Sequence, residues 1–126
     1  MILIIIPKDS TSLVNMSEIK ELTINFLKIL ADQTRLDILN LIKEKEHTQE
    51  DLMTLLMKSQ PTISQHLNLL KKNNLITYSK KENRKYYKIN DNELFNLLRS
   101  INKFVIKNNK EKLRDLIDSD VFEVLF

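Results

Sequence analysis

The sequence predicts a mainly α-helical domain that carries one small β-hairpin. Two observations lead to this fold class. Apolar residues recur three and four positions apart along most of the chain, as they do on one face of an α-helix. Between residues 75 and 90 the period changes to two, in segments rich in β-branched and aromatic residues, which is typical of paired strands. Four helices, two strands and two further helices are therefore expected, in that order.

Length and composition narrow the possible functions. The chain has 126 residues, which suits one domain with a buried core. It contains no cysteine, which excludes disulfides, thiolate metal sites and thiol catalysis. It contains no glycine, which excludes a glycine-rich phosphate-binding loop. No histidine is placed beside a serine and a carboxylate on recognisable elements, so the protein is not expected to be an enzyme.

The N-terminal segment is a short apolar run of six residues that ends at Pro7. Six residues cannot span a bilayer, and no cationic segment precedes them as in a signal peptide, so a cytoplasmic protein with no membrane contact is expected. Two interpretations of residues 1–16 stay open. They form an extension that contains a short strand, or they lie upstream of a native start at Met16. Residues 8–15 are polar and are expected to be irregular.

The first two helices are predicted from their apolar positions and from residues that suit helix starts. The first is expected over residues 17–30, with Ser17 as its cap. Asp32 or Thr34 can begin the second helix. The second helix is apolar on more than one side, which predicts that it is buried from two directions.

Capping signals place the third and fourth helices. Thr48, followed three residues later by Asp51, predicts a capping box for a short third helix. Ser59 or Gln60 can cap the fourth helix, and Pro61 suits its first turn because no hydrogen bond there requires its missing N–H. Only a few residues separate the two helices, as in a helix-turn-helix.

The fourth helix, expected over about residues 60–73, has a narrow apolar face formed by Ile63, Leu67 and Leu70. The opposite face is polar, carries no acidic residue, and can both donate hydrogen bonds to base edges and accept them. Such a face is typical of a DNA recognition helix in the major groove. His66 lies between the two faces and is expected to pack or contact the backbone. The candidate base contacts are Gln60, Thr62, Ser64, Gln65 and Asn68.

The charge of the chain is unevenly distributed. Residues 58–88 contain eight lysines and arginines and one glutamate, a net charge of +7, whereas the whole chain has a formal net charge of +3. A basic segment on an otherwise acidic protein is expected of a module that binds DNA phosphates. The hairpin tip, residues 80–85, is expected on the DNA backbone or in the minor groove. The candidate backbone contacts are Lys58, Lys72, Lys80, Lys81, Arg84 and Lys85.

The hairpin follows Asn73 and Asn74, which can end the fourth helix through a left-handed residue in place of glycine. Its strands are expected over residues 75–80 and 85–90, with residues 81–84 as the connection. Neighbouring side chains point to opposite faces of a strand, so one of the two tyrosines at positions 86 and 87 is expected in the core and the other on the surface.

A long fifth helix is predicted after Asp91 or Asn92, and a shorter sixth helix over about residues 109–118. The apolar stripes of the first and fifth helices exceed what one small domain needs, which favours a homodimer. The alternative is that they form intramolecular core. The DNA-binding and dimerisation domain is expected over residues 17–108, followed by a C-terminal helix and apolar tail over 109–126. The candidate dimer contacts are Ile19, Leu22, Phe26, Leu94, Leu97, Leu98, Ile101, Phe104 and Val105.

Three helices, a recognition helix and a basic hairpin in this order make a winged helix-turn-helix, and the motifs resemble the ArsR (arsenical-repressor) family. The resembling segments are LKILADQTRLDIL at 27–39, SQPTISQHL at 59–67, and residues 70–76 together with 84–87. The match covers about residues 26–90. It departs from the family at the wing tip, where the family's glycine is absent and Asn83 is the expected substitute for a positive φ.

The resemblance implies a homodimeric transcriptional repressor that binds a palindromic operator in double-stranded DNA. The family's thiolate metal site would fall near residues 48–55, which hold no cysteine, and its Asp/His site would fall within 92–107, which hold no histidine. We therefore expect no metal and no cofactor. A small-molecule or protein effector stays open. The alternative function is a winged-helix protein-interaction module in a transcription complex that does not read DNA sequence.

Overall fold

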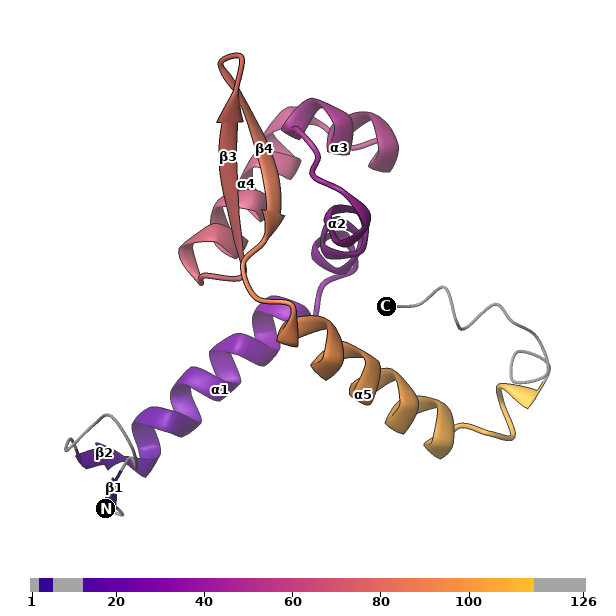
Figure 1. The fold of residues 1–126 in the computed structure, drawn as a ribbon. Helices are drawn as coiled ribbons and strands as arrows, with labels where there is room; N and C mark the ends of the chain where they lie inside the picture. The colour runs from indigo at the N-terminus through magenta and orange to yellow at the C-terminus, as the bar shows by residue number, and fades with distance from the viewer. Residues whose placement is uncertain (1–2, 6–12, 115–126) are drawn as a thin grey trace.

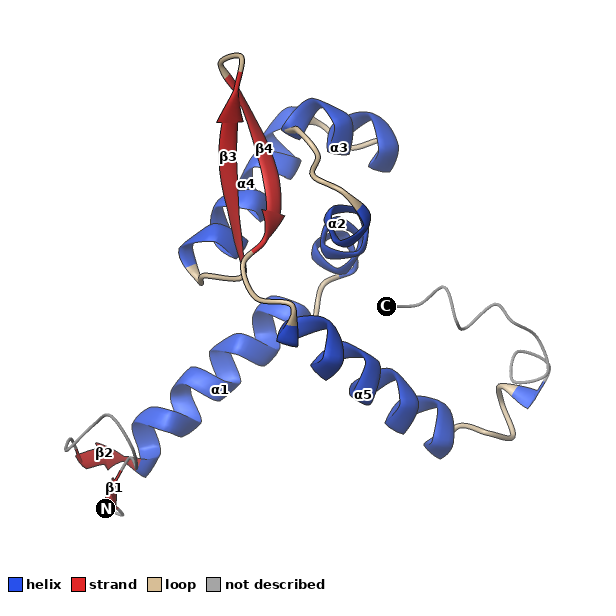
Figure 2. Ribbon diagram, viewed as in Figure 1, coloured by secondary structure: helices blue, strands red, loops and turns tan. Residues whose placement is uncertain are grey.

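The computed structural model describes residues 3–5 and 13–114 of the chain. Helices α2, α3 and α4 pack together with the β3–β4 hairpin, while α1 and α5 leave this unit as two diverging arms (Figure 1). Helices dominate, with short strand pairs (Figure 2). The elements are β1 (Leu3–Ile5), β2 (Leu13–Asn15), α1 (Met16–Leu30), α2 (Gln33–Glu44), α3 (Gln49–Leu56), α4 (Gln60–Lys72), β3 (Ile76–Lys81), β4 (Arg84–Ile89) and α5 (Glu93–Asn108). This architecture confirms the predicted winged helix-turn-helix.

Short polar side chains begin the helices, and the predicted cap is wrong only at α1. The side chain of Asp32 accepts a hydrogen bond from the backbone N–H of Arg35 at 3.0 Å and so begins α2. Helix α1 starts one residue earlier than predicted, because Asn15 rather than Ser17 is its cap. The Asn15 Oδ1 accepts from the Ser17 N–H at 2.8 Å. At α5 the Asp91 carboxylate accepts from the Glu93 N–H at 2.9 Å.

Helix α3 begins with a complete capping box. The Asp51 N–H donates to the Thr48 hydroxyl oxygen, and the Thr48 N–H donates to the Asp51 carboxylate, both at 3.1 Å. The pKa of Asp51 is lowered, first by the hydrogen bond from the Thr48 backbone, against an opposing effect of burial. The capping box confirms the predicted start of the helix.

Thr48→Ala is expected to lower the free energy of unfolding by about 1 kcal/mol, the usual loss for removing an N-cap hydroxyl. The side chain of Thr48 is buried, so water does not readily replace it. Urea denaturation of the variant measures the loss. Thr54→Ala, on the exposed side of the same helix, is the matched control and should change stability much less. Equal losses in the two variants would contradict the capping role.

The turn between α3 and α4 requires a left-handed residue, and Met57 supplies it with φ of 53°. The Met57 N–H and the Lys58 N–H both donate to the Met53 carbonyl, which closes the end of α3. Ser59 then caps α4, and Pro61 lies in the first turn of that helix. A methionine in this conformation replaces the glycine that the chain lacks.

The β3–β4 hairpin is antiparallel and pairs Ile76 with Ile89 at its base and Lys81 with Arg84 at its tip. Its connection has two residues, Glu82 and Asn83, with φ of 53° and 63°. Positive φ at both positions defines the type I′ turn that fits twisted hairpins. The expectation for Asn83 is confirmed. The predicted four-residue connection is too long, because the strand pairing extends one residue further on each side.

The core lies where α2, α4, the hairpin and the start of α5 meet. Helix α2 is buried through Ile38 and Leu39, which are fully inaccessible, as expected for a helix covered from two sides. The remaining buried apolar residues are Ile29, Leu30, Ile42, Leu52, Ile63, Leu67, Leu70, Ile76, Tyr87, Leu94, Phe95 and Leu98. Burial of these side chains holds the recognition helix and the wing in a fixed relation.

The two ends of the chain differ in part from expectation. Strand β2 shows that residues 13–15, expected to be irregular, pair antiparallel with β1. Residues 109–113 form turns, where the sixth helix was predicted to begin, so this start is wrong. Residues 115–126, which hold the rest of that predicted helix and the apolar tail, lie outside the described residues. Translation from Met16 and the domain boundaries stay predictions. Within residues 3–5 and 13–114, no helix is long and apolar enough to cross a membrane.

Candidate nucleic-acid interface

Helix α4 separates its two faces as predicted. Ile63, Leu67 and Leu70 are almost inaccessible, and their burial fixes the rotation of the helix against the core. Gln65 and Asn68 are exposed on the other side. The helix therefore presents side-chain amides to solvent, and amides can both donate and accept hydrogen bonds at an adenine edge.

The first turn of α4 carries the other predicted base contacts. Gln60 is exposed, while Thr62 and Ser64 are partly buried. The Ser59 hydroxyl donates to the Thr62 hydroxyl at 2.9 Å and accepts from the Thr62 N–H at 3.4 Å. These bonds engage Thr62 in the cap, although its hydroxyl hydrogen stays available for a base edge or a phosphate.

His66 is partly buried and contacts a side chain of another helix. Its Nδ1 lies 3.1 Å from the guanidinium of Arg35 on α2. An arginine can only donate hydrogen bonds, so the imidazole Nδ1 is the acceptor in this contact. His66 therefore joins α4 to α2 from the edge of the polar face.

Arg35 connects several helices, a role that was not predicted from the sequence. Its guanidinium donates to the carbonyls of Ile29 and Lys28, which end α1, and its Nη1 lies 3.8 Å from the Asp32 carboxylate. Together with the bond to His66, these contacts tie α1, α2 and the recognition helix together. This role could have been suspected from the position of Arg35 in the first turn of α2, three residues after the Asp32 cap.

The pKa of Asp32 is lowered, first by the hydrogen bond from the Arg35 backbone, and further by the Arg35 charge. Burial opposes this shift. A carboxyl with a lowered pKa stabilises the fold above its unfolded pKa, here about 3.8, and this contribution disappears as the pH falls through the folded value. Asp32→Asn should therefore be less stable than the wild type near neutral pH, and the difference should shrink below pH 3.8. Urea denaturation at several pH values measures this. A difference that does not change with pH would contradict it.

Tyr78 on the wing contacts a lysine of α4 and a lysine of β4. The ammonium groups of Lys71 on α4 and Lys85 on β4 lie 4.6 and 4.7 Å from the centre of the Tyr78 ring. Both are cation–π distances, so one ring contacts a lysine of the recognition helix and a lysine of the wing. Lys71 was not among the predicted backbone contacts. Its exposed position on α4 makes it a further candidate for contact with DNA phosphates.

The basic residues of the wing tip are exposed, but one of them is paired. Lys80 lies opposite Lys85 in the register, and Lys81 lies opposite Arg84. The Lys81 Nζ lies 3.1 Å from the Glu46 carboxylate, so Lys81 must leave that partner to reach a phosphate. Lys80 and Arg84 are therefore better placed than Lys81 for contact with DNA, while Lys58 and Lys72 are exposed at the two ends of α4.

The base of the wing is fixed by Tyr87. This tyrosine is buried, while its neighbour Tyr86 is partly exposed, which confirms the predicted alternation. Burial raises the pKa of Tyr87, with smaller effects from Tyr78 and Glu50. The backbone of Tyr87 also exchanges hydrogen bonds of 2.8 and 3.3 Å with His47. The wing is thereby attached to the segment that leads into α3.

The predicted dimer contacts fall into two groups. Leu94 and Leu98 are buried in the chain's own core, so the intramolecular interpretation applies to them, and Phe26 is partly buried against that core. The other predicted residues, Ile19, Leu22, Leu97, Ile101, Phe104 and Val105, are exposed. On α1, Ile24 and Leu27 are exposed as well. The two arms seen in Figure 1 thus carry apolar side chains that the described residues leave uncovered.

Metal-binding side chains do not gather in the described part of the chain. His47 Nδ1 lies 3.7 Å from the Asp51 carboxylate. Within residues 3–5 and 13–114, no third side chain of a metal-binding type joins these two to form a possible metal site. Asp51 already accepts hydrogen bonds within the capping box.

An exposed recognition helix, a basic wing and a helix-turn-helix built on one core define the class of winged helix-turn-helix DNA-binding proteins. The model of the family described as "Bacterial regulatory protein, arsR family" matches residues 32–78. The arsenical resistance operon repressor of Staphylococcus aureus is 39% identical over 83 residues, which cover 66% of this chain and 79% of that protein. The chain belongs to the arsR family of bacterial regulatory proteins.

Two further comparisons agree with this. The transcriptional repressor SdpR of Bacillus subtilis (strain 168) is 32% identical over 87 residues, which cover 69% of this chain and 97% of that protein. The solved homodimeric winged helix-turn-helix DNA-binding domain of a Mycobacterium bovis protein is similar with a TM-score of 0.67 at 23% identity, covering 75% of this chain and 88% of that domain. The structural likeness supports the fold.

Proposed function

We propose that the protein is a transcriptional repressor that binds an inverted-repeat operator as a homodimer. The single observation that carries this proposal is the exposed, polar face of α4, which carries no acidic residue and lies beside the basic wing. Gln60, Thr62, Ser64, Gln65 and Asn68 read base edges. Lys58, Lys72, Lys80, Arg84 and Lys85, with Lys81 once it leaves Glu46, bind phosphates. The named relatives are repressors, which supports the direction of regulation.

A homodimer suits this function, because one recognition helix contacts only a few base pairs. The exposed apolar residues of α1 and α5 offer a surface that a second copy would cover, and the Mycobacterium bovis domain of the same fold is a homodimer. A protein-interaction module is not favoured, because the outward residues of α4 are polar and include no aromatic or aliphatic anchor. Acting on DNA, the protein would work in the cytoplasm.

An effector of this repressor, where one acts, would not be a metal held by thiolates, because the chain contains no cysteine. Repression itself is tested with a reporter gene whose promoter overlaps the bound site. Expression should fall when the protein is produced and return with a Gln65→Ala variant. A rise in expression would show that the protein activates transcription and does not repress it.

The affinity for the operator should decrease with salt, because bound phosphates release counterions. The logarithm of the association constant should fall with the logarithm of salt concentration by about 0.9 per phosphate contacted. Arg84→Ala should reduce this slope by roughly 1 per protomer. Lys103→Ala, an exposed lysine of α5, is the matched control and should leave the slope unchanged. Fluorescence anisotropy on a labelled duplex measures both. An affinity independent of salt would contradict the phosphate contacts.

A further inference from the structure

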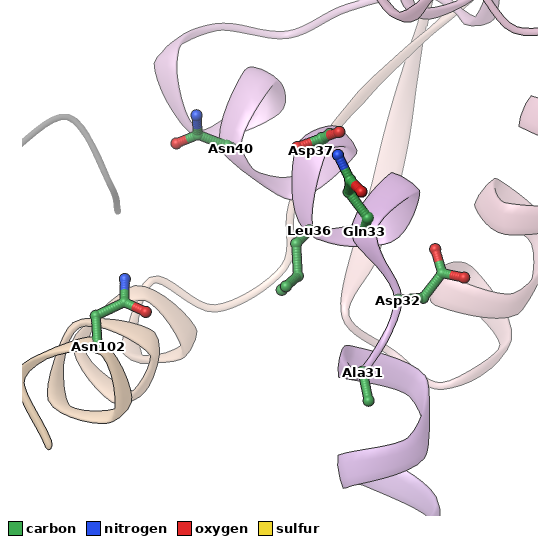
Figure 3. Close-up of a pocket in the computed structure, with 7 residues that line it drawn as sticks. All are labelled: Ala31, Asp32, Gln33, Leu36, Asp37, Asn40 and Asn102. Atoms are coloured by element: carbon green, nitrogen blue, oxygen red, sulfur yellow. The ribbon is translucent and has the colours of Figure 1, made fainter. Parts of the chain in front are cut away.

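A cavity of about 490 Å³ is lined by the α1–α2 junction, by α2 and by Asn102 of α5 (Figure 3). Leu36 extends from α2 toward α5, and Asn102 extends from α5 toward α2 (Figure 3). Asp37 and Asn40 of α2 also line the cavity. Its volume lies within the range of sites that hold small molecules.

Two amide atoms in this lining are buried and lack hydrogen-bond partners: Oδ1 of Asn40 and Nδ2 of Asn102. Burying a polar atom without a partner costs free energy, and an unpartnered group in a native protein calls for a ligand or another explanation. One atom accepts and the other donates. A molecule that satisfies both must therefore carry a donor and an acceptor.

The charge of the lining residues favours a positively charged ligand. The described lining residues include two carboxylates, Asp32 and Asp37, and no lysine, arginine or histidine. Asp32 is already paired with Arg35, which leaves Asp37 as the negative charge available to a ligand. An anion would be repelled here, whereas a cation is attracted.

We propose that this cavity binds a small organic amine that also carries a hydroxyl or carbonyl group, and that the bound amine sets the position of α5. The core holds only the first half of α5, through Leu94, Phe95 and Leu98. Asn102 lies beyond these anchors, next to the exposed apolar side chain of Ile101. A ligand bridging Asn40 and Asn102 joins this part of α5 to α2, and so connects the arm proposed to dimerise with the DNA-binding unit. This regulatory step rests on the proposed function.

Thermal unfolding of the full chain tests the binding step without DNA. Ethanolamine, glycinamide and glucosamine are the probes, and glycolate and glucose are their controls without a positive charge. At least one amine at millimolar concentration should raise the melting temperature by several degrees, because a ligand that binds only the native state stabilises it. No rise with any amine, or equal rises with the uncharged and anionic controls, would overturn the proposal.

Variants separate a binding role of the amides from a structural one. Asn102→Leu removes the unpartnered donor, so the ligand-free melting temperature should be unchanged or higher while the response to the amine is lost. Asn40→Leu should give the same result, and it replaces Asn102→Leu in the test if that variant does not fold. Asn96→Leu, an exposed position on the same helix, should keep the full response. A lower ligand-free melting temperature in both cavity variants, or an unchanged response, would overturn the proposal.

The regulatory step is read separately by anisotropy on the operator. The amine should change the operator dissociation constant by roughly fivefold or more in the wild type and not in Asn102→Leu. An amine that binds through the two amides but leaves operator affinity unchanged would overturn the regulatory step. Binding of the amine by a protein that binds no DNA would overturn the proposed function and leave the amine site standing.

Discussion

Gln65→Ala and Asn68→Ala should each weaken binding to the cognate operator by about 1–3 kcal/mol and relax specificity at the base pair that the side chain contacts. The expected cause is the loss of two hydrogen bonds from an amide to a base edge. Both side chains are exposed, and neither lies in the core that positions α4, so the helix itself should be unaffected. Anisotropy titrations on the operator and on a random duplex measure the two effects.

The random duplex distinguishes base reading from phosphate binding. Loss on the operator with little change on random DNA supports base contacts. Asn96→Ala, an exposed amide on α5, is the matched control and should bind both duplexes as the wild type does. Equal losses on both duplexes would show that Gln65 and Asn68 contact phosphates, and the assignment of the reading face would then be wrong.

Phe104→Glu should convert the proposed dimer into monomers. Phe104 is 63% exposed within one chain, and burying a phenylalanine on association contributes about 1.5–3 kcal/mol. The substitution acts twice in a symmetric dimer, so the dimer dissociation constant should rise roughly 10²- to 10⁴-fold. Sedimentation velocity over a range of protein concentrations measures this change, and operator affinity should fall with it.

Met57→Glu is the matched control, because Met57 is 89% exposed but lies between α3 and α4, away from the two arms. It should leave the oligomeric state unchanged. A Phe104→Glu protein that remains dimeric would show that α5 is not the dimer surface, and a wild-type chain that sediments as a monomer would remove the dimer from the proposal altogether.

Features determined by neighbouring residues could be predicted from the sequence. The capping box of Thr48, the two faces of α4 and the positive φ of Asn83 all depend on residues within one turn or one hairpin. The positive φ of Glu82 was missed, because glutamate has no preference for this conformation and the pairing of the wing forces it.

Contacts between distant segments could not be predicted in the same way. Arg35 meets His66 across 31 positions, and Tyr78 gathers lysines from α4 and β4. The apolar stripe of α5 is also divided between the core and the exposed surface. Leu94 and Leu98 pack inward while Phe104 is exposed, because the core reaches only the first half of the helix.

The central claim is that the protein reads DNA sequence as a dimer, and selection of bound sequences from a random duplex pool tests it most directly. The full chain is used with a metal chelator present and again with added transition metals. We expect enrichment of one inverted repeat, with half-sites about one helical turn apart, in both conditions. Enrichment lost on adding metal would contradict the expectation that no metal binds. No enrichment in either condition would contradict sequence-specific binding itself.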